Sequence, residues 1–512
     1  MSIVSTQPAR SGRGQELGLL IFALIAVLGA WILAYYGVHN SQPPQLLPDN
    51  FTLIAGGGAG TLLLCHLLIR RFAPYADPIL FPASIMLTGL GLAMIYRIDF
   101  QLVARGDNPD ARGQMLLAFV GLIFMMTTIG FLRDHRWLRR ITYISLIVGL
   151  LLLLLPLVPG LGVEIYGAQL WINIAGFSFQ PAELSKIFLA VFFAGYLVTQ
   201  RDNLSLAGPK FLGIHFPRLR HSLPILIAWL TCMGILALER DFGTALLFFG
   251  LFVAMLYVAT ERTSWIVIGG LLSTAGVWLI IQVMPHIQAR FTIWLHAFDQ
   301  DVYDAQYGSY QLVQGWFGMA SGGLFGTGLG QGSPANSFAA NSDFIIASLG
   351  EELGLVGLLG ILSLYVIIVT RAMKIGVALR DGFGKLFAAG LGFTIALQCF
   401  VVVGGITRVI PLTGLAMPFL AKGGSALLTN FIIIGILLRM SDSARRPFTA
   451  PATPLSTIST GELPAKLIND DETATDDETA TGVVVTTHNS SPSPDDQMET
   501  TAVPRITEEE KA

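Results

Sequence analysis

The stretch LGLLIFALIAVLGAWILAYYG, residues 17–37, decides the fold class, because its 21 residues include no charged side chain. An apolar run of this length spans the hydrocarbon core of a bilayer as a helix, since backbone amides in lipid must bond within their own segment. Over the whole chain, 53% of the 512 residues are apolar and 13% are charged, about half the charged share of a soluble domain. The sequence therefore predicts an all-α, multi-pass membrane protein and excludes a soluble one.

Eleven further apolar runs follow, separated by short polar connections. In windows of about 19 residues, the expected spans are 17–37, 51–69, 79–96, 114–132, 139–158, 181–199, 222–239, 242–259, 264–284, 343–370, 386–408 and 423–440. An even number of spans places both termini on one side of the membrane.

Positive charges predict which side that is, because Lys and Arg gather on the cytoplasmic side. With the N-terminus inside, the cytoplasmic segments hold 20 Lys and Arg and the opposite side holds seven. The seven are Arg97, Arg105, Arg112, Arg240, Arg290, Arg408 and Lys422. Both termini are therefore expected in the cytoplasm, with no cleavable signal peptide, and the long connections 159–180 and 285–342 are expected outside.

The C-terminal segment differs in composition from the rest of the chain. Residues 1–440 carry 26 Lys and Arg against 20 Asp and Glu, whereas residues 441–512 carry 5 against 14. The second segment is rich in Thr, Ser and Pro and repeats DETAT at 471–475 and 477–481. It has too little apolar surface to fold, so we expect a disordered acidic cytoplasmic tail.

Charged residues inside the spans cost about 2.5–3.5 kcal/mol each on insertion scales, so each requires a reason. Glu183 and Lys186 lie three residues apart in QPAELSKIF and can pair on one helix face. The pair either braces two helices or lines a polar cavity, and the spacing leaves both open.

Two further acidic sites lie at span boundaries. In LERDFGTALLFF, residues 238–249, Asp241 begins a helix, and spacing alone favours an N-cap over a general base. In NSDFIIASLGEELG, residues 341–354, Asp343 begins a span and Glu351 and Glu352 follow. Neighbouring helix residues point about 100° apart, so we expect one of these glutamates to face a cavity and the other a partner helix.

Cations flank the Pro/Gly-rich hairpin that ends the sequence of spans. Arg408 and Lys422 either extend toward the membrane surface or form an anion site beside a broken helix. The run GGLFGTGLGQG, residues 322–332, has no preceding strand and no Gly-Lys-Ser/Thr ending, which excludes a nucleotide loop. The histidines lack metal-ligand spacing, and the three cysteines all lie in apolar runs, which indicates no disulfide.

Four stretches in this order resemble the SEDS family of membrane-embedded peptidoglycan polymerases, whose members are RodA and FtsW. They are AQLWINIAGFSFQPAELSKI at 168–187, ERDFGTALLFF at 239–249, GWFGMASGGLFGTGLGQGS with SDFIIASLGEELGLVG at 315–333 and 342–357, and PLTGLAMPFLAKGGSALL at 411–428. The hairpin and the additional N-terminal helices resemble the RodA of actinobacteria more than FtsW.

The resemblance implies three parts of the chain. The family core has ten helices, and residues 75–440 match it. Residues 1–74, with two helices, are then an N-terminal extension, and residues 441–512 are the tail. The chain departs from the family at Leu170, where relatives commonly have Arg, and at Lys422, which adds a positive charge.

The same resemblance implies roles for individual residues. It makes Asp241 the catalytic residue, against the cap that spacing alone favours. It also carries over Glu183, Lys186, Asp343, Glu351 and Glu352 as site residues. The cations Arg240, Arg290 and Lys422 are further candidates because they are expected on the outer side, where the diphosphate leaves, and Ser425 completes the residues predicted to bind substrate.

The implied reaction joins two lipid II molecules at the outer leaflet, with undecaprenyl diphosphate leaving. Asp241 would take the proton of the attacking sugar hydroxyl, and the anomeric centre would invert. Cations would meet the charge of the leaving diphosphate, with a divalent ion, Mg²⁺ or Mn²⁺, as a possible cofactor that the sequence does not reveal. Relatives work with a class B penicillin-binding protein, a transpeptidase, so we expect the same partner and no nucleic acid. The alternatives are a flippase for the lipid-linked precursor, which needs no outer base, and a scaffold without activity.

Overall fold

The computed structural model describes residues 12–39, 50–165, 168–174, 176–205, 210–211, 214–215, 219–305 and 308–447. The predicted disordered tail lies almost entirely outside the described residues.

All twelve expected spans coincide with helices, which confirms the all-α membrane class. The helices are α1 (Arg13–Val38), α2 (Phe51–Phe72), α3 (Leu80–Ala104), α4 (Ala111–Phe131), α6 (Thr142–Leu154), α7 (Pro181–Ser205), α8 (Leu219–Glu239), α9 (Phe242–Thr260), α10 (Ser264–Val283), α14 (Ile345–Ala378), α15 (Gly382–Ile406) and α16 (Gly424–Arg445). Within the described residues, ten are long and apolar enough to cross a membrane, and α6 and α8 contribute shorter apolar helices. The chain is a multi-pass membrane protein.

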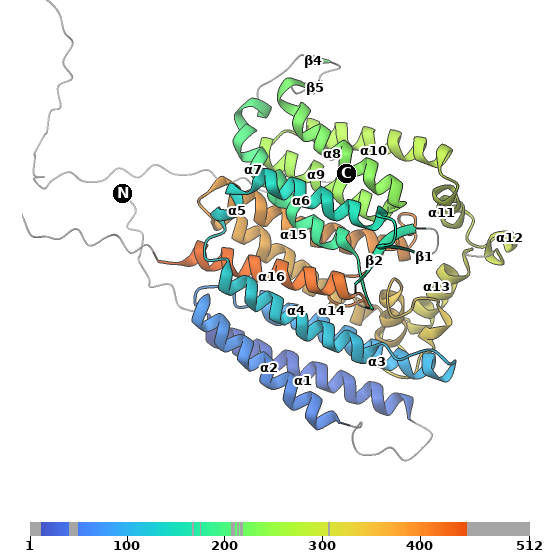
Figure 1. Ribbon diagram of the computed structural model, residues 1–512. Helices are drawn as coiled ribbons and strands as arrows, with labels where there is room; N and C mark the ends of the chain where they lie inside the picture. Colours follow the sequence, from blue (N-terminus) through green and yellow to red (C-terminus); the bar gives the residue numbers. More distant parts are fainter. Residues whose placement is uncertain are drawn as a thin grey trace, which may run out of the picture. The chain divides into compact units, whose positions relative to one another are not determined.

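The helices pack side by side as one bundle (Figure 1). The most extensive helix pairs join α4 with α16, α14 with α15, α6 with α7, and α1 with α3. The two additional helices lie at one edge, where α1 packs on α3 and α2 on α4. The predicted N-terminal extension is therefore in direct contact with the core.

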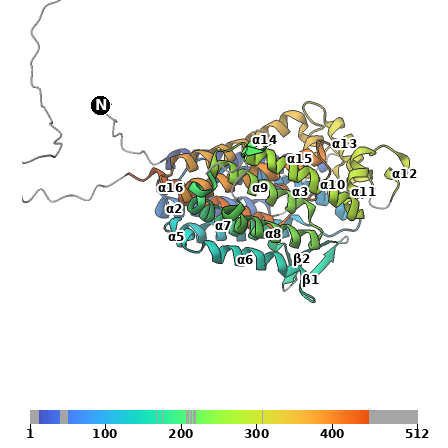
Figure 2. The same ribbon diagram turned by 90° about the horizontal axis from the view of Figure 1, so that it is seen from above.

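The long connections gather at one end of the bundle, opposite the short helix α5 (Arg136–Arg140) (Figures 1 and 2). One forms α11 (Pro285–Leu295), α12 (Gln300–Tyr303), α13 (Tyr310–Gly322) and the turn η2 (Pro334–Asn336). The other follows the turn η1 (Leu155–Leu157) and forms an antiparallel sheet of β1 (Gly162–Ile165), β2 (Ala168–Ile174) and β3 (Phe177–Phe179). We call this end of the bundle the loop end. The remaining strands, β4 (Lys210–Phe211) and β5 (Ile214–His215), pair with each other.

Helix α14 is not continuous, because Gly354 has φ 68° and ψ −172°, outside the helical range. The glycine-rich run 322–332 lies against this break. Thr327 N donates to Glu351 O at 2.9 Å, and Leu355 N donates to Gly323 O at 3.0 Å. The run thus supplies hydrogen bonds that the broken helix cannot supply, as non-helical backbone at membrane depth requires.

One expected position is wrong. Arg97 was expected in an external connection, but it lies within α3 and its exposed fraction is 1%. A buried guanidinium needs a partner, and it finds one in α14, described below.

Candidate functional site

Asp241 lies at the loop end, in the tight turn between α8 and α9. Arg240 adopts φ 62° and reverses the chain, and Asp241 N then donates to Leu236 O at 3.0 Å. The Asp241 Oδ1 atom accepts from Thr244 N at 2.9 Å, which confirms the expected N-cap. The other oxygen, Oδ2, lies 3.5 Å from the Gln180 amide. The residue is only 5% exposed, so water does not satisfy the carboxyl group. Oδ1 is used for the cap, and Oδ2 has the distant Gln180 amide as its partner.

Arg290 of α11 lies near both Asp241 and Asp343. Its guanidinium interacts electrostatically with both carboxyl groups. Its Nη1 also donates to Thr413 O at 3.0 Å. A Cβ on Gly414, which has φ 76°, would lie 3.9 Å from both Arg290 Nη2 and Asp343 Oδ2. The hairpin that follows α15 therefore passes close to both groups, at a position that only glycine adopts easily.

Burial sets the acid–base character of these groups. It raises the pKa of Asp241, opposed by hydrogen bonds from Thr244 and by the positive charge of Arg290. Burial also raises the pKa of Asp343, opposed by Arg290. A carboxyl group with a raised pKa is a stronger base once it is deprotonated.

Glu183 and Lys186 form a buried pair on α7. Lys186 Nζ donates to Glu183 Oε2 at 2.6 Å and to Gln398 Oε1 at 3.1 Å. The Gln398 amide donates in turn to Ala416 O at 2.9 Å. The pair is thus linked to the hairpin near Arg290, and Glu183 is close enough to act electrostatically on Asp241.

Glu351 and Glu352 point in different directions, as expected for neighbouring helix residues. Glu352 accepts from Arg97 Nε of α3 at 2.6 Å and from Gly330 N at 2.9 Å. Glu351 accepts from Ser333 N at 2.6 Å and lines a cavity. The expectation that one glutamate faces a partner helix and the other a cavity is confirmed.

Lys422 lies in a third cluster. Its Nζ is 2.6 Å from Asp110 Oδ2, which also accepts from the Asn341 amide at 2.8 Å. Ser425 is buried, and within the described residues its hydroxyl has no hydrogen-bond partner. The group around Asp241, Arg290 and Asp343 is therefore bridged to Glu183 and Lys186, whereas Glu351 and Glu352 on α14 and Lys422 beside Asp110 form two further clusters.

Two cavities open beside this central group. One, of about 190 Å³, has apolar walls from α8, α9, α10 and α11 and reaches Asp241 and Arg240. The second, also about 190 Å³, lies between α11, α13 and the hairpin and includes Arg290 and Asp343. Asp241 therefore lies where an apolar cavity approaches a charged cluster.

Sequence reasoning missed several partners. Gln398 and Arg97 lie within membrane helices and were not predicted to pair, although a polar residue at membrane depth signals a need for a partner. Asp110 precedes α4 and carries no such signal. Glu239 is the last residue of α8, two positions before Asp241. It is buried, and both of its carboxyl oxygens lack a hydrogen-bond partner among the described residues.

The chain is similar to known proteins over most of its length. The model of the FtsW/RodA/SpoVE family, described as cell cycle protein, matches residues 78–446. "Peptidoglycan glycosyltransferase RodA" of Mycobacterium tuberculosis H37Rv is 44% identical over 448 residues, which cover 87% of this chain and 94% of that protein. "Probable peptidoglycan glycosyltransferase FtsW" of Trichlorobacter lovleyi is 31% identical over 376 residues, covering 72% and 94%.

A solved structure has the same fold. It is described as "Structural coordination of polymerization and crosslinking by a peptidoglycan synthase complex", and it aligns with a TM-score of 0.57 at 24% identity over 73% of this chain and 99% of that one. The family match and the mycobacterial relatives together show that this chain belongs to the FtsW/RodA/SpoVE family of cell cycle proteins, the SEDS family.

Proposed function

We infer that this chain is a peptidoglycan glycosyltransferase, the activity for which its RodA and FtsW relatives are named. Its substrate is lipid II, a disaccharide-pentapeptide on undecaprenyl diphosphate, and its product is a glycan strand. The observation that carries the proposal is the position of Asp241, a buried carboxyl group between an apolar cavity and a cationic group.

Asp241 acts as the general base. Its Oδ1 is held by the Thr244 N–H, so the carboxylate has a fixed direction, and Oδ2 lies 3.5 Å from the Gln180 amide. The attacking sugar hydroxyl donates its proton to Asp241 as its oxygen bonds to the anomeric carbon of the donor. The bond from that carbon to the diphosphate oxygen breaks on the opposite face. One displacement with one base inverts the anomeric centre.

Arg290 stabilises the leaving diphosphate. It is the cation beside Asp241 and Asp343, whereas Lys186 is paired with Glu183 and Lys422 with Asp110. Positive charge at the point where negative charge develops lowers the barrier.

A divalent cation, Mg²⁺ or Mn²⁺, fits this group as a further proposal. Among the described residues no cluster of three or more His, Cys, Asp or Glu gathers to hold a metal. Mg²⁺, however, usually takes one or two carboxylates and completes its shell with substrate phosphates and water. Asp241 and Asp343 are the carboxylates on offer, and the ion would supply charge neutralisation at the diphosphate.

The apolar cavity beside Asp241 suits a prenyl chain. Its walls carry Trp229, Phe249 and Ile280 on three different helices. A prenyl chain that moves from the bilayer into this cavity stays in an apolar environment, and its diphosphate end would then lie near Arg290.

The proposal places the loop end outside the cytoplasmic membrane and both termini inside. Without Arg97 and Arg13, which are both buried within helices, the outer side keeps six expected positive residues and the inner side 19, in agreement with the positive-inside rule. The process served is cell elongation or division. The proposed partner is a class B penicillin-binding protein, which would crosslink the strands as the described peptidoglycan synthase complex does.

The test uses labelled lipid II and two variants of the same residue. Asp241→Asn keeps an N-cap side chain, since Asn caps as well as Asp, but removes the base. Asp241→Ala removes both. We expect polymer from the wild type and none from either variant.

The matched control is Asp381, which caps α15 at the other end of the bundle by accepting from Gly384 N at 2.7 Å. Asp381→Ala removes the cap, at a cost of about 1 kcal/mol, and also the contact of Asp381 Oδ1 with His135 Nε2 at 2.9 Å, and it leaves polymerisation intact. Full activity in Asp241→Asn would refute the proposal that Asp241 is the general base. Translocation of lipid II in liposomes without any polymer would support the rival flippase.

A further inference from the structure

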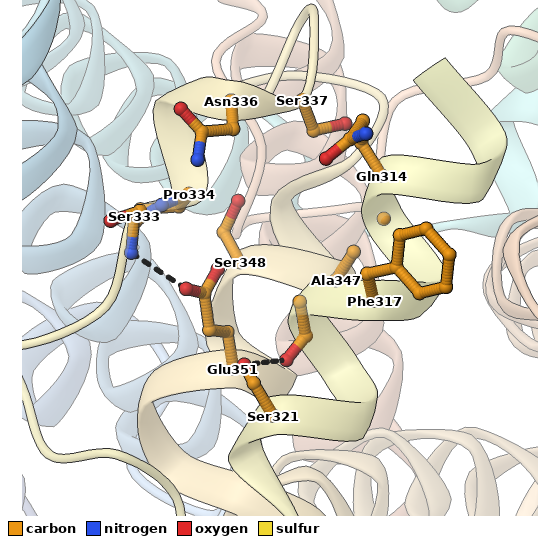
Figure 3. A pocket seen from close by; sticks show the side chains of 12 residues that line it. Gln314, Phe317, Ser321, Ser333, Pro334, Asn336, Ser337, Ala347, Ser348 and Glu351 are labelled. Carbon is orange, nitrogen blue, oxygen red and sulfur yellow. Dashed lines mark hydrogen bonds between the residues drawn. The ribbon is translucent and has the colours of Figure 1, made fainter. Parts of the chain in front are cut away.

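A polar cavity of about 180 Å³ lies at the loop end between α13, η2 and the first turns of α14. Figure 3 shows its lining side chains, with Asn336 and Ser337 on one side and Ser321 on the other. It shares no lining residue with the cavity that holds Arg290 and Asp343. The cavity is therefore a second site, separate from the group around Asp241.

Glu351 gives this cavity a negative charge. The side chain is 8% exposed, and Ser333 N donates to Oε1 at 2.6 Å (Figure 3). In the part of the chain that the structure describes, Glu351 has no ion pair, whereas its neighbour Glu352 is paired with Arg97. Arg105, near the rim, is already engaged by Ala335 O and by Asn336 Oδ1. A buried carboxylate without a counter-charge is costly, so a cationic ligand would stabilise it.

The serine hydroxyls around Glu351 are arranged as acceptors. Ser321 Oγ donates to Gly318 O at 2.7 Å, Ser348 Oγ to Ala340 O at 2.9 Å, and Ser337 Oγ to Gln311 O at 3.3 Å. A hydroxyl has one hydrogen and two lone pairs. Because each hydrogen is spent on a backbone carbonyl, the hydroxyls offer lone pairs to a ligand.

We propose that this cavity binds a primary ammonium group. An ammonium group has three N–H donors and no acceptor, which matches one carboxylate surrounded by acceptor hydroxyls. A phosphate or carboxylate would be repelled by Glu351, and Ca²⁺ would need more carboxylate or carbonyl ligands than one. Phe317, whose side chain is 57% exposed at the cavity, offers an apolar surface to the methylenes of an aminoalkyl chain.

The inference rests on the proposed function, because it assigns this ammonium group to the peptide of lipid II. The aminoalkyl side chain of the stem peptide would enter the cavity while the sugar reacts at Asp241. Glu351 is then a residue that recognises the peptide rather than one that takes part in bond formation.

The test compares lipid II with a free side-chain amine and the same lipid II with that amine acetylated. Acetylation removes the charge and leaves the rest of the molecule unchanged. For the wild type we expect KM to rise roughly tenfold or more on acetylation, as for the loss of a charge-assisted hydrogen bond, with kcat little changed. Glu351→Gln keeps an acceptor for Ser333 N–H but loses the charge, so it should use both lipids with the same high KM. Glu164→Gln, an exposed carboxylate on β1, is the control and keeps the preference.

A binding measurement makes the result independent of turnover. The dissociation constants of both lipids are measured with Asp241→Ala, alone and combined with Glu351→Gln. Equal affinity for both lipids in the Asp241→Ala background would overturn the proposal, whatever the polymerisation assay shows. Discrimination that survives Glu351→Gln would overturn it too. No polymer from the wild type, with the amine preference in binding intact, would instead refute the proposed function.

Discussion

The Arg97 guanidinium of α3 and the Glu352 carboxylate of α14 form a buried ion pair, with Nε 2.6 Å from Oε1. Arg97 Nη2 also donates to Gly332 O at 2.6 Å, and Glu352 Oε2 accepts from Gly330 N at 2.9 Å. The pair therefore joins α3 to α14 and also fixes the glycine-rich run against them. This run is the one that completes the hydrogen bonding of α14 at Gly354.

Replacing Arg97 alone should be strongly destabilising. Arg97→Met leaves Glu352 buried without its counter-charge, at a cost of about 3–5 kcal/mol in the free energy of unfolding. The measurement is thermal unfolding of the purified protein. The double variant Arg97→Met, Glu352→Gln removes both charges of this pair and keeps an acceptor for the Gly330 N–H, so it should recover most of the loss. A double variant no more stable than Arg97→Met would contradict this account.

Gly37 should not tolerate a side chain. A Cβ there would lie 2.0 Å from Leu329 O and 2.8 Å from Gly330 Cα, and both are backbone atoms. Gln331 also donates to Gly37 O at 2.9 Å. Gly37→Ala must push the glycine-rich run away from α1, at a cost of about 1–3 kcal/mol, and should expose that run to protease.

The control for Gly37 is in the same helix. A Cβ on Gly29 meets nothing within 4 Å, so Gly29→Ala should be neutral or slightly stabilising. Equal behaviour of the two variants in thermal unfolding and proteolysis would show that α1 does not brace the run.

The spans could be predicted from composition because hydrocarbon imposes one requirement on every segment that crosses it. The break in α14 could not. Its position depends on two hydrogen bonds between α14 and the glycine-rich run, from Thr327 N to Glu351 O and from Leu355 N to Gly323 O, and no local pattern encodes that approach. The antiparallel sheet β1–β3 was missed for a similar reason, since its strands are short and pair within a connection read only as a loop.

The candidate site divides in the same way. Asp241 at a helix N-terminus and the pair of Glu183 with Lys186, three residues apart, are local features that a short stretch of sequence reveals. Arg97 and Glu352 are 255 residues apart, and Lys186 and Gln398 are 212 apart. One sequence has no means of matching such partners. The signal that was available is that a polar residue within a span needs a partner, which applies to both Arg97 and Gln398.

Polymerisation should fall at low pH through the titration of Asp241. Only the deprotonated carboxylate accepts a proton, and burial raises the pKa of Asp241 above the ordinary value of about 3.9. The rate should therefore be lost as the pH drops through this raised pKa, at a higher pH than a free aspartate would give. The measurement is the pH profile of kcat/KM.

Variants of Arg290 test the direction of the pKa shift on which that prediction depends. Its positive charge lowers the pKa of Asp241, so Arg290→Gln should move the acid limb of the residual activity to higher pH, and Arg290→Lys should move it less. A limb that moves to lower pH in Arg290→Gln, or a flat wild-type profile, would contradict the role of Asp241 as base.

Variants of Glu183 and Lys186 can show whether this pair only braces two helices or is also needed for activity. Lys186→Met leaves Glu183 buried and unpaired and should cost about 3–5 kcal/mol in the free energy of unfolding. The double variant Glu183→Gln, Lys186→Met removes both charges and should regain most of that stability. Its activity should nevertheless stay low, by up to about 10²-fold in kcat, because Lys186 Nζ no longer positions Gln398, which holds Ala416 O of the hairpin near Arg290. A stable double variant with full activity would leave the pair as a brace between helices and nothing more.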